Sequence, residues 1–231
     1  SHAQHMPSHI FTRVGSWSDS VIANTASAKA DTASGPNTLH AYDYMVYAHL
    51  QMGQDRAAGS VKDSASAIAK PPDHFAAAFA YAAMPARLAL ERGDWASAAK
   101  LSLSPATDSY PWAKYPQAEA SNAYARALGA AALRDAAATE SELARLTRLR
   151  DAATELKLGY WAEQINVQLD VVRGFAAFKA GQKDAGIAAL RKAATSGEAC
   201  YFLGTDSAPH PVAKKLALNG IPGIFNAPVA I

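Results

Sequence analysis

Apolar side chains recur at intervals of three and four positions along most of the chain, and short polar or proline-containing segments separate the periodic stretches. This spacing gathers apolar residues on one face of an α-helix. The pattern therefore predicts consecutive pairs of helices. The predicted pairs are residues 7–14 with 17–30, 38–52 with 55–69, 74–92 with 95–102, 116–133 with 137–154, and 159–180 with 183–195.

The turn inside each predicted pair carries a short signature. A glycine is followed after two positions by a residue that is often aromatic, and after five positions by a small residue. Glycine in the left-handed conformation ends the first helix, and the small residue lets the second helix approach closely. The copies start at Gly15, Gly53, Gly93 and Gly181, with small residues at Ser20, Ala58, Ala98 and Gly186, and a degenerate copy lies near Arg134.

The pattern changes after Gly197, where proline and glycine interrupt a largely apolar sequence. We therefore predict a helical repeat domain over residues 1–196 and an irregular tail over residues 197–231. Disordered segments are poor in apolar residues. We therefore expect the tail to pack on the last helices.

Composition supports an all-helical fold. Half of the residues are hydrophobic, many of them alanine, and only 9% are aromatic; alanine is the strongest helix former and lets helices pack closely. The net charge of +2, from 22 basic and 20 acidic residues, is too balanced for a nucleic-acid-binding protein. Arg145, Arg148 and Arg150 alternate with acidic residues and predict a solvated helix face. No run approaches the roughly 18 apolar residues that a membrane span needs.

The helix pairs and their Gly-x-aromatic-x-x-small turns resemble the tetratricopeptide repeat (TPR) family over residues 7–195. The resemblance implies an all-α fold, a TPR-like α-solenoid of about five antiparallel helix pairs with an irregular C-terminal tail. In that family the first helices of the pairs line a concave groove. The glycines are 38, 40 and then 88 residues apart, whereas the usual period is about 34 residues, so helices or loops here are longer than standard.

Three blocks are similar to a group of bacterial TPR proteins of unassigned role: residues 5–10 (His-Met-Pro-Ser-His-Ile), 43–47, and 84–87 with 91–95. Members of that group generally continue on both sides of this region. The resemblance implies an interior portion of a bacterial protein, for which the cytoplasm and the periplasm both stay open. Because terminal repeats need polar caps, we expect self-association through apolar faces at the truncated ends of the array.

The repeat register predicts which side chains face the groove. Alignment of the first helices on their turn glycines selects Arg13, Asp43, Tyr47, Arg87, Glu91 and Tyr124. Arg13 and Arg87 offer paired hydrogen bonds to a carboxylate; in the competing interpretation, acidic and basic residues of this set form ion pairs between helices. Trp112 lies in an aromatic, proline-flanked loop that either covers the groove or packs against its own repeat.

Three of the seven histidines fall within eight residues of one another at the start of the sequence: His2, His5 and His9. Pro7 favours an extended Met6 and a helix that starts near position 7. We therefore expect His5 just before this helix and His9 on its first turn.

The same register places His9 and His40 on neighbouring first helices. Neutral imidazole is the commonest protein ligand of zinc, copper and nickel. His5, His9 and His40, with His2 or Asp43 as a further ligand, therefore form the hypothesis of a metal site. The competing interpretation is that these histidines pack and form structural hydrogen bonds.

The sequence contains no nucleophile elbow, phosphate-binding loop, dinucleotide fingerprint or His-Glu-x-x-His motif. Cys200 is the single cysteine, which excludes an intrachain disulfide, and we expect it to be a small buried residue. We therefore predict a noncatalytic scaffold that recognises a peptide or protein partner in the groove without a cofactor. A metal-binding protein that holds Zn, Cu or Ni is the alternative, and an enzyme built from dispersed groove residues is a further one.

Overall fold

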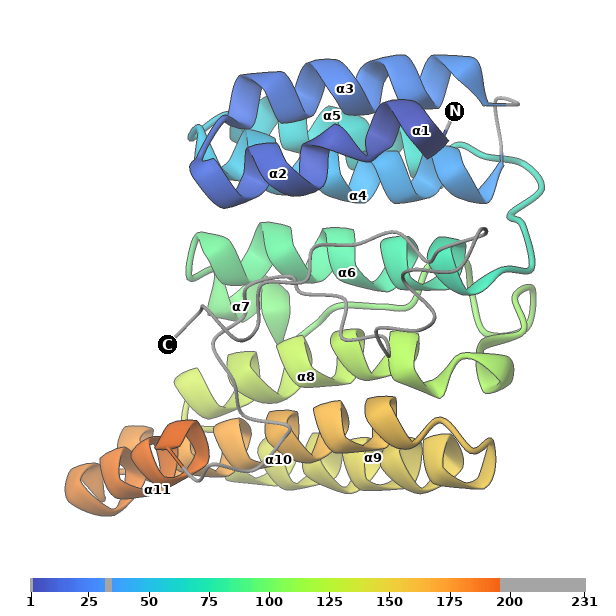
Figure 1. Cartoon of the computed structure of the whole chain (residues 1–231). Coiled ribbons are helices and arrows are strands. Elements are labelled where there is room, and N and C mark those ends of the chain that lie inside the picture. The colour runs from blue at the N-terminus through green and yellow to red at the C-terminus, as the bar shows by residue number, and fades with distance from the viewer. Residues whose placement is uncertain (1, 32–34, 196–231) are drawn as a thin grey trace, which may run out of the picture.

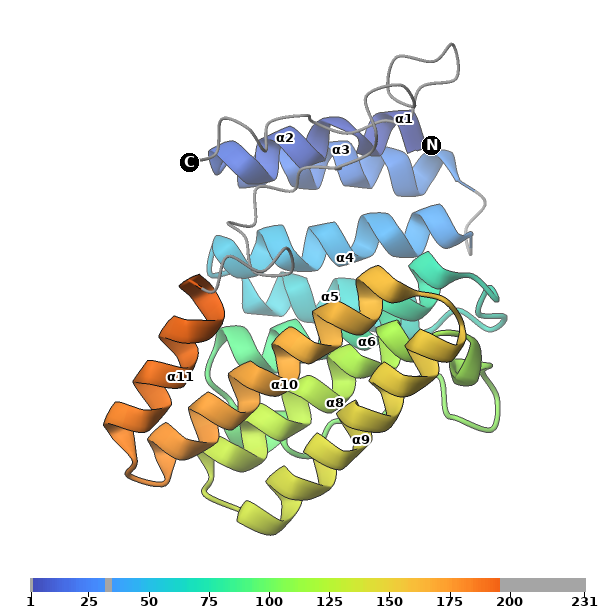
Figure 2. The same cartoon turned by 60° about the horizontal axis from the view of Figure 1, so that its bottom comes forward.

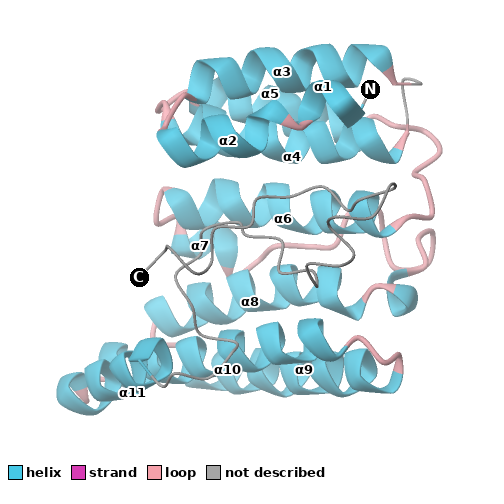
Figure 3. Ribbon diagram, in the orientation of Figure 1, coloured by secondary structure: helices cyan, strands magenta, loops and turns pink. Residues whose placement is uncertain are grey.

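The computed structural model describes residues 2–31 and 35–195. Within these residues every regular element is a helix and no strand occurs (Figures 1 and 3), which confirms the all-α prediction. The elements are α1 (His2–His5), α2 (Pro7–Val14), α3 (Trp17–Ala30), α4 (Pro36–Gln51), α5 (Asp55–Ser66), α6 (Phe75–Glu91), α7 (Trp95–Ala98), η1 (Trp112–Lys114), α8 (Pro116–Ala132), α9 (Ala136–Glu155), α10 (Gly159–Lys179) and α11 (Lys183–Thr195).

The α-helices are stacked in chain order, from the blue N-terminal pair to the orange C-terminal pair (Figure 1). Each α-helix contacts the one that follows it, and α4, α6, α8 and α10 also contact one another in succession. The observed bounds agree with the predicted pairs to within three residues, except that α7 ends at Ala98 and not near residue 102. From the second pair onward, the first helices of successive pairs thus lie side by side.

Left-handed residues end the first helix of each pair, as the turn signature predicts. The φ angles are 73° at Gly15, 70° at Gly53, 63° at Gly93, 93° at Gly181 and 60° at Arg134. Arg134 therefore adopts, in the degenerate copy, a conformation that L-residues rarely occupy. Ser20, Ala58 and Ala98 are fully buried, which is the close approach that the signature requires.

The N-terminus differs from the prediction. Met6 is helical, with φ −51° and ψ −39°, and the residues before it form the short helix α1. The Met6 N–H donates to the His2 carbonyl oxygen at 3.2 Å. His5, on α1, is only 1% exposed, and α1 packs on α3. This burial outweighs the local preference for an extended residue before proline.

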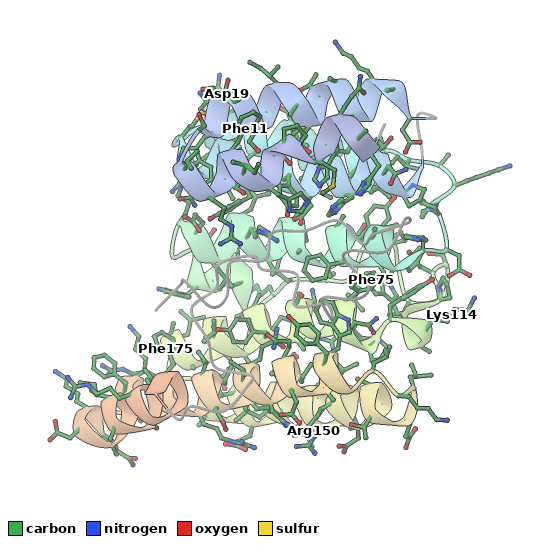
Figure 4. The ribbon with its side chains drawn as sticks, in the orientation of Figure 1. Phe11, Asp19, Phe75, Lys114, Arg150 and Phe175 are labelled. Carbon is green, nitrogen blue, oxygen red and sulfur yellow. The ribbon has the colours of Figure 1, made fainter. Side chains whose placement is uncertain are left out.

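Helix α10 reaches back to the third pair. The rings of Trp161 and Phe75 on α6 are 5.2 Å apart, and those of Phe175 and Trp95 on α7 are 5.8 Å apart. Figure 2 shows α10 running along the C-terminal half beside α8, α9 and α11, and Figure 4 labels Phe75 and Phe175. Aromatic contacts therefore join helix pairs that are not consecutive in the chain.

The prediction of a solvated face on α9 is wrong for Arg145. Its Nη2 donates to Glu119 on α8 at 2.7 Å. Glu142, which is 7% exposed, accepts from Arg126 on α8 at 2.5 Å. These side chains lie where α9 packs on α8, and each charge has an opposite partner that compensates for its burial. Arg148 is exposed, as predicted.

None of the described helices has both the length and the hydropathy that crossing a bilayer requires. Ile10, Val14 and Ile22, on the first pair, are 53%, 71% and 67% exposed. Self-association through such a face stays a prediction. The predicted tail of residues 197–231, including Cys200, lies outside the described residues.

Candidate functional site

A cavity of about 520 Å³ lies between α2, α4 and α6. We call it the arginine cavity, because two of the predicted groove residues, Arg13 and Arg87, line it. Its lining residues are Thr12, Arg13, His40, Asp43, Tyr44, Tyr47, Phe79 and Arg87. The structure therefore brings four of the predicted groove residues together around one space.

An ion pair between α4 and α6 forms one wall of the arginine cavity. Arg87 Nη2 donates to Asp43 Oδ2 at 3.2 Å, and Arg87 Nε lies 3.2 Å from Asp43 Oδ1 without hydrogen-bond geometry. Both Asp43 Oδ1 and Arg87 Nε are buried, and neither has a hydrogen-bond partner among the described residues. The Arg87 guanidinium also lies 5.5 Å from the ring centre of Tyr47. The pair joins α4 to α6 and forms part of the lining of the arginine cavity.

The charge balance of the arginine cavity is positive. Arg13 and Arg87 are protonated at neutral pH, as arginines in proteins are, whereas Asp43 is the one acidic residue of the lining. Burial, followed by the nearby histidines, lowers the pKa of His40 to about 3. Burial raises the pKa of Tyr44 to about 12. His40 and Tyr44 are thus neutral, and the lining attracts an anion.

A second cavity of about 320 Å³ adjoins the first, and Phe79 and Arg87 line both. The predicted groove residues Glu91 and Tyr124 line this second cavity. Gln168 of α10 also lines it, and Gln168 Oε1 is buried without a hydrogen-bond partner among the described residues. We call the two cavities together the groove, which extends from α2 to α10.

Three histidines meet beside the arginine cavity, and we call them the histidine cluster: His5, His9 and His40. One ring nitrogen of each lies within 4.8 Å of the other two, and His5 Nε2 lies 3.0 Å from His9 Nε2. The ring of His2 stacks on that of His5 at 5.6 Å. Asp43, which was considered with His2 as a further ligand, forms an ion pair with Arg87 instead. The predicted convergence of these histidines is therefore present.

Hydrogen bonds orient the buried member of the cluster. His5 Nδ1 lies 2.6 Å from Asn24 Oδ1. The Asn24 amide nitrogen donates to the Ser20 carbonyl oxygen at 2.8 Å, which identifies Oδ1 as the atom that faces His5. Because Oδ1 only accepts hydrogen bonds, His5 carries its proton on Nδ1. Its Nε2 therefore presents a lone pair to His9.

His9 is held from the opposite side by α4. The Tyr44 hydroxyl lies 2.9 Å from His9 Nδ1. Burial lowers the pKa of His5 to about 4 and also lowers the pKa of His9. The histidine cluster is therefore a set of neutral imidazoles at neutral pH, in the protonation state that ligates metal ions.

Of the two interpretations of the Trp112 loop, the structure supports inward packing and not a position over the groove. Trp112 is 3% exposed and belongs to a core cluster with Tyr110. Its indole N–H donates to the Pro105 carbonyl oxygen at 2.9 Å, and it lines neither cavity of the groove. The loop that carries Trp112 folds inward because its two large rings bury more apolar surface there than they would over an open groove.

Three side chains of this region were missed from the sequence: Tyr44, Phe79 and Asn24. Helical spacing could have indicated Tyr44 and Phe79. Tyr44 lies four residues after His40 and Phe79 lies eight residues before Arg87, so each shares a helix face with a lining residue. Asn24 lies four residues after Ser20, the small residue of the first turn signature. No local pattern indicates that Asn24 holds a histidine from another helix.

Comparisons with known proteins find short resemblances to dihydroorotases. The chain is 63% identical to the dihydroorotase of Edwardsiella ictaluri over 43 residues, 19% of its length, and 65% identical to that of Parasynechococcus marenigrum over 43 residues. The dihydroorotase of Sphingopyxis alaskensis is 63% identical over the same length. The chain spans only 12% to 13% of the length of these relatives. No family model and no solved structure matches the chain.

Proposed function

We propose that the chain is a TPR-like α-solenoid and that its groove binds a peptide segment of a partner protein through the C-terminal carboxylate group of that segment. The observation that carries the proposal is the arginine cavity, which is lined by two arginines and one acidic residue. A carboxylate accepts paired hydrogen bonds from guanidinium groups. It would therefore fit between Arg13 and Arg87, which line the same cavity.

The size of the groove favours a peptide. The arginine cavity, at about 520 Å³, lies within the range of ligand pockets, which is roughly 300–1,000 Å³. The second cavity extends the site along α6 to α8 and α10, with a mostly apolar lining and Glu91. An extended segment would place its carboxylate in the arginine cavity and apolar side chains in the second cavity. The resemblance to dihydroorotases covers too little of those enzymes to carry their activity to this chain.

Peptides displayed with free C-termini provide the test. Peptides enriched by the wild-type protein are synthesised with a free or an amidated C-terminus, and their binding is measured by fluorescence anisotropy. A hydrogen bond to a charged group contributes about 1.5–3 kcal/mol. We therefore expect amidation, Arg13→Gln or Arg87→Gln each to weaken binding by roughly 10-fold to 150-fold.

Arg148→Gln is the matched control, because Arg148 is exposed on α9 and lines neither cavity. Its affinity should equal that of the wild type. Circular dichroism establishes that each variant is folded, which matters for Arg87→Gln because it leaves Asp43 buried without its cation. Equal affinity for free and amidated peptides would rule the proposal out.

A further inference from the structure

We propose that the histidine cluster binds one divalent transition-metal ion of the zinc type, with His5, His9 and His40 as its imidazole ligands. This inference goes beyond the proposed peptide groove. It depends on the convergence of three imidazoles from α1, α2 and α4, and on the groups that orient two of them.

The nitrogen separations come close to those of a tetrahedral site. Zinc binds imidazole nitrogen at 2.0–2.1 Å, which places tetrahedral ligands about 3.3 Å apart. His5 Nε2 and His9 Nε2 are already 3.0 Å apart. The widest separation between ligand nitrogens in the cluster is at most 4.8 Å. These nitrogens must therefore approach each other by at most about 1.5 Å to reach the tetrahedral spacing. His40 is only partly buried, which leaves its side chain room for this movement.

The nitrogens opposite the proposed ion have partners that suit metal ligands. Ligating histidines nearly always use their second ring nitrogen in a hydrogen bond that fixes their orientation. His5 Nδ1–H donates to Asn24 Oδ1, as derived above, so His5 Nε2 is already in the ligating tautomer. His9 Nδ1 faces the Tyr44 hydroxyl at 2.9 Å, which accepts as well as donates hydrogen bonds.

Metal binding would change the tautomer of His9, whereas the His9 ring itself would stay neutral. In the metal-free protein His9 Nε2–H donates to His5 Nε2, and Tyr44 O–H donates to His9 Nδ1. With an ion bound, the His9 proton moves to Nδ1 and Tyr44 becomes the acceptor. Tyr44 is thus a positioning residue that serves both states.

The donor set selects the class of ion. Imidazole nitrogen suits zinc, copper and nickel, whereas magnesium and calcium prefer oxygen ligands, and no carboxylate belongs to the cluster among the described residues. Three histidines leave one tetrahedral position open. His40 and Tyr44 line the arginine cavity, so water or an anion would reach that position from the cavity.

The test is a titration of chelator-treated protein with Zn²⁺ against a chromophoric chelator. We expect one ion per chain with a dissociation constant of about 1 μM or tighter. His9→Gln and His40→Gln should each weaken binding at least about 10-fold, and Tyr44→Phe should do so by roughly 10-fold to 100-fold. Co²⁺ bound in place of Zn²⁺ should show the strong visible absorption of a tetrahedral site.

His49→Gln is the matched control. His49 lies on α4 like His40, but its ring is hydrogen-bonded to Gln54 and it does not belong to the cluster. This variant should bind Zn²⁺ as the wild type does. Binding weaker than about 10 μM by folded wild-type protein, or an equal loss in His49→Gln and His40→Gln, would overturn the proposal. Should a histidine variant be unfolded, Tyr44→Phe decides, and unchanged affinity in that variant counts against the site.

Discussion

Gly129→Ala should destabilise the protein, although alanine is the better helix former. Gly129 is buried on α8 where that helix packs on α7. A Cβ atom at this position would lie 2.4 Å from the Ala99 backbone nitrogen and 2.7 Å from the Trp95 carbonyl oxygen. Relief to a separation of 3.4 Å requires a shift of about 1 Å. Both neighbours are backbone atoms, so the helices themselves must move apart.

Gly59→Ala gives the matched comparison. Gly59 lies inside α5, and a Cβ there would meet no atom within 4 Å. Replacement of a helical glycine by alanine stabilises by about 1 kcal/mol, and this gain applies at both sites. Overpacking costs about 1–3 kcal/mol, and we expect the upper end at Gly129 because backbone must shift. Gly129→Ala should thus lose about 2 kcal/mol, whereas Gly59→Ala should gain up to about 1 kcal/mol.

Urea unfolding followed by circular dichroism at the helical band measures both variants. Both variants gain the same helix propensity, so the difference between their free energies of unfolding reports the cost of the close contact at Gly129. A Gly129→Ala variant that is as stable as Gly59→Ala would refute the packing of α7 against α8. A change in the slope of the transition would instead indicate that the array unfolds in parts.

Two further substitutions test the loop and a helix cap. Trp112→Ala should lower the free energy of unfolding by about 3–5 kcal/mol, because the indole is buried and bonded to Pro105; in urea unfolding, a loss below about 1 kcal/mol would contradict its place in the core. Asp94 caps α7, and hydrogen bonds from Ser97 hold its pKa below the usual 3.8. Since that pKa is lowered on folding, its stabilisation is present above the unfolded pKa and is lost as pH falls through the folded pKa. The stability advantage of wild type over Asp94→Asn should be constant from neutral pH to about pH 5 and should shrink at lower pH; an advantage that does not change with pH would contradict this.

Local patterns account for what was correctly predicted from the sequence. The apolar spacing and the turn signature depend on residues within one hairpin, so together they predicted the helix pairs and their bounds. The same register brought Arg13, Asp43, Tyr47 and Arg87 to one cavity, because residues at equivalent positions of successive first helices face the same side. Whether these side chains bind a ligand stays a prediction.

The features that were missed depend on contacts between distant segments. Trp161 and Phe75 meet only because α10 reaches back to α6, and no spacing within either helix indicates this. The local preference of a residue before proline also predicted an extended Met6, whereas burial of His5 against α3 keeps Met6 helical. The position of Trp112 stayed open between two alternatives, because it depends on the surrounding core, which a loop sequence does not reveal.

Photo-crosslinking from position 79 tests the central claim, that the groove is the binding surface. Phe79 lines both cavities, so benzoylphenylalanine in its place would lie within reach of a bound peptide. Ile22 is exposed on α3 and lines neither cavity, so the same replacement there is the control. We predict that a selected carboxylate-bearing peptide crosslinks to position 79 and not to position 22, and that Arg87→Gln reduces the yield. Equal crosslinking at both positions, or a yield at position 79 that Arg87→Gln leaves unchanged, would contradict the account.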